Sequence, residues 1–162
     1  LEFRRVLFQS VVAVVTSVLR ICGHTIRRSA RLVEELGKVP RVWASAESLN
    51  QVFLNLLINA AHAMAQGGTV HVSLTASGDG LTVQLRDEGP GIPQEIRKTL
   101  FQPFQTTKAR GTGLGLVTAK HLVEAHGGSI AIECPPAGGT VITIALEARA
   151  GLDHRGGSAP RT

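Results

Sequence analysis

Two segments in which apolar and polar residues alternate restrict the possible fold more than any other feature of this sequence. Residues 69–75 and 81–86 both follow a period of two, which is typical of strands with one buried face. Gly78-Asp79-Gly80 lies between them, and such a sequence favours a tight turn between strands. The two segments therefore predict an antiparallel hairpin whose apolar face must be covered by another layer.

Three stretches with helical spacing can supply that layer, at about residues 4–28, 46–65 and 114–126. Ser45 is a candidate N-cap of the second helix, and Gly pairs follow the second and third. The first stretch is apolar but is interrupted by polar residues opposite its apolar face, so it predicts an amphipathic helix packed on a sheet and not a membrane span. That apolar face comprises Leu7, Val11, Val14, Val15, Val18 and Cys22.

The remaining segments complete a two-layer arrangement. Residues 31–36 indicate a strand, residues 129–133 and 140–146 a final hairpin, and Pro93 the start of a short helix. We therefore predict an α/β fold, a two-layer α/β sandwich with a mixed, mostly antiparallel sheet and helices on one face. One domain is expected over residues 1–147, followed by a disordered tail over 148–162.

Composition narrows the possible functions. The 17 basic and 12 acidic residues give a net charge of +5, but no run of Lys or Arg concentrates it, so we expect no nucleic-acid partner. Two cysteines without a CxxC pair argue against a disulfide framework and for a reducing compartment. Because neither a start Met nor a signal-peptide pattern opens the chain, we expect a fragment of a longer protein. The fragment by itself is expected to be monomeric.

The helix at residues 46–65 carries one narrow polar stripe. Gln51, Asn55, Asn59 and His62 lie at helical spacing among apolar neighbours. An ordinary surface helix also has a polar face, but this stripe is one residue wide and contains neither Lys nor Glu. Uncharged amides in such a place favour a partly buried ligand, and amide oxygens are suitable ligands for Mg²⁺.

A second motif, residues 87–92 (DEGPGI), follows a predicted strand. Asp87 could accept hydrogen bonds from an exocyclic amine. Gly89 and Gly91 would allow a sharp turn and leave room for a flat ring. By itself, this motif is more often a plain turn.

Two further motifs lie downstream. Residues 111–116 (GTGLGL) open a helix, and their exposed backbone N–H groups favour phosphate, although the pattern is neither GxGxxG nor a Walker loop. Residues 101–108 (FQPFQTTK) suit a lid over a nucleotide, with the two Phe side chains as anchors. A flexible linker and a simple anchored loop are the alternatives.

In this order and spacing, the four motifs resemble the ATP-binding catalytic domain of bacterial sensor histidine kinases, in the superfamily shared with gyrase, Hsp90 and MutL. The resemblance covers roughly residues 40–146 and includes residues 124–130 (EAHGGSI). It implies a Bergerat-type ATP-binding fold, ATP and Mg²⁺ as cofactors, and protein histidine kinase activity in a cytoplasmic domain of a two-component system, with a parent protein that could be membrane-anchored.

The resemblance also implies roles for individual residues. Asn59 would be the Mg²⁺ ligand, Asp87 would receive the adenine amino group, and Asn55 and Lys108 would be the catalytic residues. Thr140 would help to hold a water beside Asp87. The full set expected at the cofactor is Asn55, Asn59, Asp87, Gly89, Gly91, Ile92, Thr107, Lys108, Gly111, Thr112, Gly113, Leu114, Gly115, Leu116 and Thr140.

One part of the family pattern is missing. None of the six histidines lies in a phospho-acceptor pattern of the type HE-x-x-N/R-x-PL, so the acceptor is expected on a dimerisation domain that preceded Leu1 in the parent protein. The partners implied are that domain and the receiver domain of a response regulator. His62 stands where many relatives carry an acidic residue or lysine, and we assign it no role beyond that of an exposed helix residue.

Four other functions compete with this one. The related ATPases carry a glutamate where Asn55 stands, and an amide cannot act as that general base, so transfer to histidine is favoured over hydrolysis. A serine kinase of the anti-sigma type and a non-catalytic nucleotide sensor would have a similar pocket. A basic nucleic-acid module would require strongly salt-dependent binding to DNA or RNA.

Overall fold

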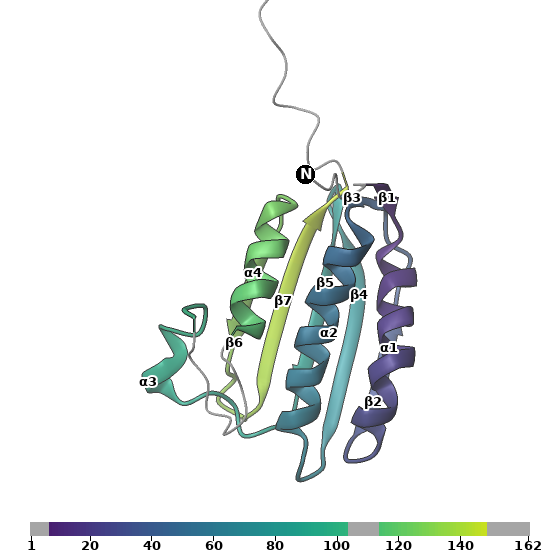
Figure 1. The fold of residues 1–162 in the computed structure, drawn as a ribbon. Coiled ribbons are helices and arrows are strands. Elements are labelled where there is room, and N and C mark those ends of the chain that lie inside the picture. Colours follow the sequence, from purple (N-terminus) through teal and green to yellow (C-terminus); the bar gives the residue numbers. More distant parts are fainter. Residues whose placement is uncertain (1–6, 104–113, 149–162) are drawn as a thin grey trace, which may run out of the picture.

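The computed structural model describes residues 7–103 and 114–148 of the chain (Figure 1). The predicted tail from residue 149 onward lies outside these ranges. In chain order the elements are β1 (Leu7–Gln9), α1 (Val11–Arg27), β2 (Arg31–Leu36), β3 (Val42–Ala44), α2 (Ala46–Ala63), β4 (Thr69–Ser77), β5 (Gly80–Asp87), α3 (Gln94–Arg97), α4 (Gly115–Ala125), β6 (Ser129–Glu133) and β7 (Thr140–Glu147).

The main sheet has five strands in the order β2-β4-β5-β7-β6. β2 pairs with β4 in parallel, and the other neighbours are antiparallel. The predicted hairpin is confirmed, because β4 and β5 pair from Ser77 opposite Gly80 down to Val70 opposite Asp87. The predicted mixed, mostly antiparallel sheet is confirmed as well.

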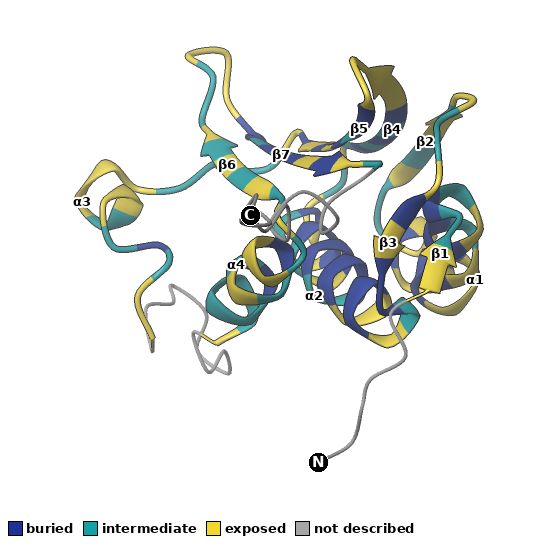
Figure 2. Cartoon of the chain, turned by 90° about the horizontal axis from the view of Figure 1, so that it is seen from above, coloured by how far each residue is buried: buried dark blue, intermediate teal, exposed yellow. Residues whose placement is uncertain are grey.

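The long helices α1, α2 and α4 cover one face of this sheet, and buried residues concentrate between the two layers (Figure 2). α2 occupies the middle, with Phe53, Leu56 and Leu57 almost fully buried. Along β4, Val70, Val72 and Leu74 are buried against the helices, while His71 and Ser73 alternate with them on the uncovered face. The structure is thus the predicted two-layer sandwich, in which hydrophobic burial fixes the helix layer to the sheet.

The predicted start of the first helix, at about residue 4, is wrong. Leu7–Gln9 forms β1, which pairs antiparallel with β3, and α1 begins only after Ser10, whose Oγ accepts a hydrogen bond from the N–H of Ala13 over 3.2 Å. Leu7 is therefore 52% exposed and lies outside the apolar face predicted for it. The rings of Phe8 and Trp43 pack at 5.6 Å across the two strands, a contact that the helical spacing of the sequence does not reveal.

The remainder of the α1 prediction is confirmed. Val11, Val14, Val15, Val18 and Cys22 are buried on one side of the helix. Across residues 7–103 and 114–148, no helix combines the length and apolar character needed to cross a bilayer. α1 is therefore an amphipathic helix that packs its apolar side on the sheet, as its sequence indicates.

Candidate nucleotide site at one end of the sheet

Asn55 and Asn59 of the amide stripe lie in the second half of α2, on the side that meets the start of α4. Ser45 caps the start of the helix, its Oγ accepting from the N–H of Ser48 over 3.2 Å. Asn55 and Asn59 are half-buried, whereas Gln51 and His62 are exposed. The two asparagines thus combine access to solvent with partial burial, as a ligand site requires, and the expected exposure of His62 is confirmed.

Asp87 is the last residue of β5 and is buried, with 9% of its surface exposed. Its Oδ1 accepts a hydrogen bond from the backbone N–H of Gly89 over 2.9 Å. A Cβ at position 89 would lie 2.9 Å from that oxygen and 3.0 Å from Cβ of Ala63. Only glycine fits this turn, which brings the carboxylate close to the end of α2.

β7 supplies the neighbour of Asp87. Thr140 is its register partner on β7 and is also buried. Gly139 has a φ of +81°, and a Cβ there would collide with the carbonyl oxygen of Asp87. Gly91, with a φ of +73°, would place a Cβ 3.2 Å from the carbonyl oxygen of Gly139. The structure therefore brings Asp87, Gly91 and Thr140 together. No role was predicted from the sequence for Gly139, whose only signal is its place in a Gly pair before a strand.

Glu88, in the same DEGPGI motif, bonds instead to the backbone of β4. Its Oε2 accepts a hydrogen bond from the N–H of Thr69 over 2.9 Å, and its own N–H donates to the Thr69 carbonyl over 3.2 Å. These contacts extend the pairing of β4 and β5 by one residue. Of the two adjacent carboxylates, Asp87 is the one held beside Thr140 and Gly89.

The segment after this turn is braced by Arg97. Nε of Arg97 donates to the carbonyl of Ile92 over 2.8 Å, which closes residues 92–97 into a compact unit around α3. Ile92 is half-buried. Farther on, Nζ of Lys120 on α4 lies 4.8 Å from the ring centroid of Phe101. This cation–π contact joins the stretch that follows α3 to α4.

α4 begins against the asparagines of α2. The carbonyl of Gly115 accepts a hydrogen bond from Nδ2 of Asn55 over 3.4 Å, and a Cβ at Gly115 would lie 3.9 Å from Nδ2 of Asn59. Leu114 is exposed and Leu116 half-buried. The structure thus brings together the amide stripe and the end of the glycine motif. Five predicted site residues lie outside the described ranges: Thr107, Lys108, Gly111, Thr112 and Gly113.

The donor set of this end of the sheet suits a metal nucleotide. Within the described part of the chain there is no group of three or more His, Cys, Asp or Glu side chains that could hold a metal by itself. The side-chain amide oxygens of Asn55 and Asn59, beside the start of α4, could instead complete the shell of an Mg²⁺ whose other ligands are phosphate oxygens and water. The N-terminus of α4 adds positive potential, which favours phosphate.

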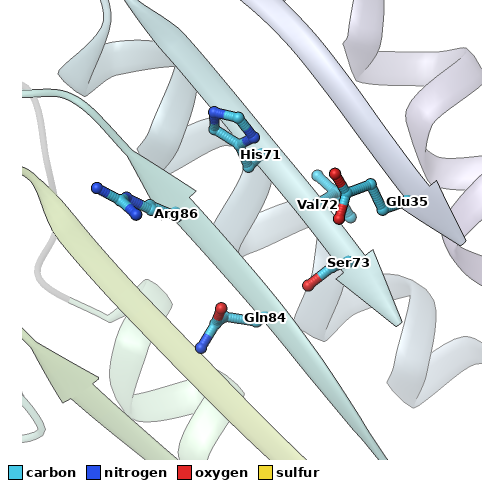
Figure 3. A pocket seen from close by; sticks show the side chains of 6 residues that line it. All are labelled: Glu35, His71, Val72, Ser73, Gln84 and Arg86. Atoms are coloured by element: carbon cyan, nitrogen blue, oxygen red, sulfur yellow. The ribbon is translucent and has the colours of Figure 1, made fainter. Parts of the chain in front are cut away.

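A second concave region lies on the uncovered face of the sheet (Figure 3). This hollow of about 160 Å³ is lined by Glu35, His71, Val72, Ser73, Gln84 and Arg86. None of the predicted site residues lines it. Asp87 directly follows Arg86, but it points to the helix side of the sheet because successive residues of a strand face opposite ways. The hollow and the candidate nucleotide site are therefore separate.

Comparison with known proteins decides the family. Residues 44–150 match the model of the histidine kinase-, DNA gyrase B- and HSP90-like ATPases. The chain belongs to this family. The match spans α2, Asp87, Thr140 and α4, so this ATPase domain contains every site element described above. The resemblance that the four motifs suggest is confirmed.

The relatives of this ATPase domain include a sporulation kinase and sensor histidine kinases. It is 34% identical over 148 residues to sporulation kinase E of Bacillus subtilis, covering 87% of the chain and 20% of that protein. It is 39% identical over 108 residues to the sensor histidine kinase ZraS of Escherichia coli K12, covering 67% of the chain and 23% of ZraS. The chain thus spans about a fifth of the length of these relatives.

Solved structures agree on the fold. The mycobacterial sensor histidine kinase MprB superimposes with a TM-score of 0.79 and 29% identity, over 91% of this chain and 100% of that one. The catalytic domain of histidine kinase ThkA, in a nucleotide-free form, gives 0.80 and 28%, over 89% and 96%. The domain is an ATP-binding catalytic domain of the histidine kinase type.

Proposed function

We propose that this domain binds Mg·ATP between α2, α4 and the end of β5, and that it donates the γ-phosphate to a histidine on another domain. The observation that carries the proposal is the joint position of two groups. A buried, oriented carboxylate, Asp87, ends β5, and the asparagines of α2 meet the start of α4 at Gly115. The carboxylate suits an exocyclic amine, and the helix start suits phosphate.

Each residue then has a defined task. Asp87 accepts a hydrogen bond from the adenine amino group, with Thr140 beside it to hold a water. Gly89, Gly91 and Ile92 form the wall of the base pocket. Asn59 ligates the Mg²⁺, and Asn55 keeps α4 in place through Gly115 while lying next to the phosphates. Leu114, Gly115 and Leu116 present the start of α4, and Thr107, Lys108, Gly111, Thr112 and Gly113 complete the phosphate contacts by the family resemblance.

The chemistry requires little more than this positioning. Bound Mg²⁺ neutralises charge on the phosphates. The chain orients the nucleotide, excludes water from the base and provides Lys108 for charge on the transferred group. Asn55 cannot take a proton from water as a glutamate would, which disfavours hydrolysis and leaves the γ-phosphate for an incoming imidazole.

The acceptor would be a histidine-bearing dimerisation domain of the same parent protein. The phosphoryl group would pass from there to the receiver domain of a response regulator. Support comes from the relatives, which are sensor histidine kinases several times longer than this chain. We propose a cytoplasmic location for the catalytic domain, because ATP is the donor.

The test mixes this domain, Mg·ATP labelled in the γ-phosphate, and the separately produced dimerisation domain of its parent protein. Label on that domain that is lost in acid but survives alkali identifies phosphohistidine and supports the proposal. Acid-stable label indicates a serine kinase of the anti-sigma type. ATP binding without transfer indicates a nucleotide sensor, and rapid phosphate release without an acceptor indicates an ATPase. The negative control is Asp87→Asn, in which labelling at an ATP concentration near the Kd of the natural domain should fall strongly because nucleotide binding is weaker.

A further inference from the structure

His126 connects the two helices of the candidate site at the end far from the nucleotide. Nε2 of His126 lies 3.1 Å from the backbone nitrogen of Ser45, which donates to it. Nδ1 of the same ring lies 2.6 Å from the carbonyl oxygen of Leu122. Ser45 is the N-cap of α2 and His126 the C-cap of α4, so this bond joins the start of one helix to the end of the other across 81 positions of sequence.

The geometry determines the tautomer of the ring. A backbone N–H can only donate, so Nε2 must be the acceptor of the Ser45 N–H. The ring proton therefore resides on Nδ1 and is donated to Leu122. With both nitrogens used, the imidazole is neutral and its orientation is fixed.

Both partners of this bond are themselves held firmly. The N–H of Gly128 donates to the carbonyl of Val123 over 3.0 Å and that of Gly127 to Glu124 over 3.0 Å. With a φ of +72° at Gly127, these bonds form a Schellman motif that ends α4 at His126. The other polar groups of Ser45 are also hydrogen-bonded. Its carbonyl accepts from the N–H of Leu49 over 3.0 Å, and its Oγ accepts from the N–H of Ser48.

The same two helices meet again at the candidate site. α2 and α4 run antiparallel (Figure 1), and at the start of α4 the carbonyl of Gly115 accepts a hydrogen bond over 3.4 Å from Nδ2 of Asn55, which lies in the middle of α2. Asn55 lies ten residues after Ser45, and Gly115 lies eleven before His126. At 1.5 Å of rise per residue, the helix segment from Ser45 to Asn55 is about 15 Å long and the segment from Gly115 to His126 about 16.5 Å long. The bonds thus close a frame with sides of nearly equal length, and the bond at His126 is the shorter of the two.

We infer that His126 is a positioning residue for nucleotide binding. By bonding to Ser45 it fixes how far α4 lies along α2, and so where Gly115 stands relative to Asn55 and Asn59. This inference rests on the proposed function, because it matters only if the phosphates bind where those residues meet. Loss of the bond lets α4 shift or tilt, and the long bond of Asn55 to Gly115 is the contact that then fails first.

Two substitutions separate this role from general stability. In His126→Gln, Oε1 reaches about as far as Nε2 and can still accept from the Ser45 N–H. In His126→Asn, the shorter amide can occupy the place of Nδ1 and donate to Leu122 but does not reach Ser45. Ser45→Ala is the matched control, because it removes the Oγ cap of α2 and keeps the backbone N–H that bonds to His126.

We expect His126→Asn to raise the Kd of the domain for Mg·ATP about five- to tenfold, within the range typical of coupling between sites. His126→Gln should stay within about twofold of the natural protein, and so should Ser45→Ala, despite its lower Tm. All titrations are made well below the lowest Tm. Equal Kd values for His126→Asn and His126→Gln, or a loss of affinity in Ser45→Ala as large as that in His126→Asn, would overturn the inference.

NMR of the nucleotide-free domain tests the role of His126 independently of the proposed function. The ring nitrogens of His126 should show the neutral tautomer protonated at Nδ1. The side-chain amide of Asn55 should shift in His126→Asn and stay in place in Ser45→Ala. If these signals behave as expected while the natural domain binds no ATP, the proposed function is wrong, but the coupling of His126 to Asn55 through α4 is still supported. If ATP binds but the Asn55 signal ignores His126→Asn, the inference alone fails.

Discussion

The backbone N–H of Gly89 donates a hydrogen bond to Oδ1 of Asp87 over 2.9 Å, so the glycine after the strand orients the carboxylate that ends it. A side chain at position 89 would begin 2.9 Å from the same oxygen. The turn therefore holds the Asp87 carboxylate in one orientation without any ligand. Such preorganisation reduces the cost of ordering the site on binding.

Asp87→Asn should weaken ATP binding by about 1.5–3 kcal/mol, the contribution of a hydrogen bond to a charged group. The new amide oxygen can still accept from Gly89, so the fold should be retained. Its NH2 group, however, would face the adenine amine with a donor in place of an acceptor. Calorimetric titration with ATP and GTP measures the effect, and discrimination between the two bases should decrease.

Glu88→Gln is the matched control for Asp87→Asn. It removes an adjacent carboxylate charge, but Oε2 of Glu88 is bonded to the Thr69 N–H at the sheet. We expect nearly unchanged ATP affinity and a stability loss below about 1 kcal/mol, the net contribution of one exposed hydrogen bond. Equal losses of ATP affinity in the two variants would contradict the assignment of Asp87 to the base.

Asn59→Ala should weaken Mg·ATP far more than metal-free ATP. The proposed task of this amide is to ligate the metal, and the neutral side chain contributes little to free nucleotide. Titrations of ATP with Mg²⁺ and with a chelator give the two affinities. Gln51→Ala, on the same stripe but exposed near the start of α2, should leave both unchanged. A similar loss with and without metal would remove Asn59 from the metal shell.

Gly138→Ala and Gly139→Ala form a second matched pair. Both glycines have positive φ, +101° and +81°. A Cβ at 138 meets nothing within 4 Å, whereas one at 139 collides with the Asp87 carbonyl. We expect Gly138→Ala to cost about 1 kcal/mol of stability from backbone strain alone. Gly139→Ala should cost more and also impair ATP binding, which thermal unfolding and titration can measure.

Stability should fall at high pH because of Cys22. Burial raises the pKa of this thiol above its ordinary value of 9.0, since desolvation disfavours the thiolate. Above pH 9 the unfolded chain releases the proton that the folded chain keeps, so unfolding becomes more favourable as pH rises. The slope for one proton is at most about 1.4 kcal/mol per pH unit.

Two variants isolate this contribution of Cys22. Denaturant unfolding between pH 8 and about 10.5 is compared for Cys134→Ser and for Cys134→Ser combined with Cys22→Ala. The protein that keeps Cys22 should lose stability more steeply with pH. Parallel curves would show that the thiol ionises alike in the folded and unfolded states.

Local sequence signals account for most of the fold. The alternation of apolar and polar residues identified the β4–β5 hairpin. The narrow polar stripe among apolar residues identified the side of α2 that carries Asn55 and Asn59. The short strands β1 and β3 were not predicted, because three residues carry no usable period and their pairing is non-local.

The contacts of individual site residues were harder to foresee. Alternation along β5 places Asp87 on the buried face, and the resemblance places Thr140 beside it. Nothing in the DEGPGI motif indicates, however, that Glu88 bonds to Thr69. The bond of Ser45 to His126 depends on where two helices end in space. Such pairings arise from tertiary packing and not from spacing along the chain.

The position of β7 has a consequence for synthesis on the ribosome. β7, the last strand among the described residues, inserts between β5 and β6 and brings Thr140 to Asp87. Until it emerges from the exit tunnel, the edge of β5 remains exposed and can pair with other nascent chains. A translation product that stops before residue 140 would thus lack nucleotide binding and would also be prone to aggregate.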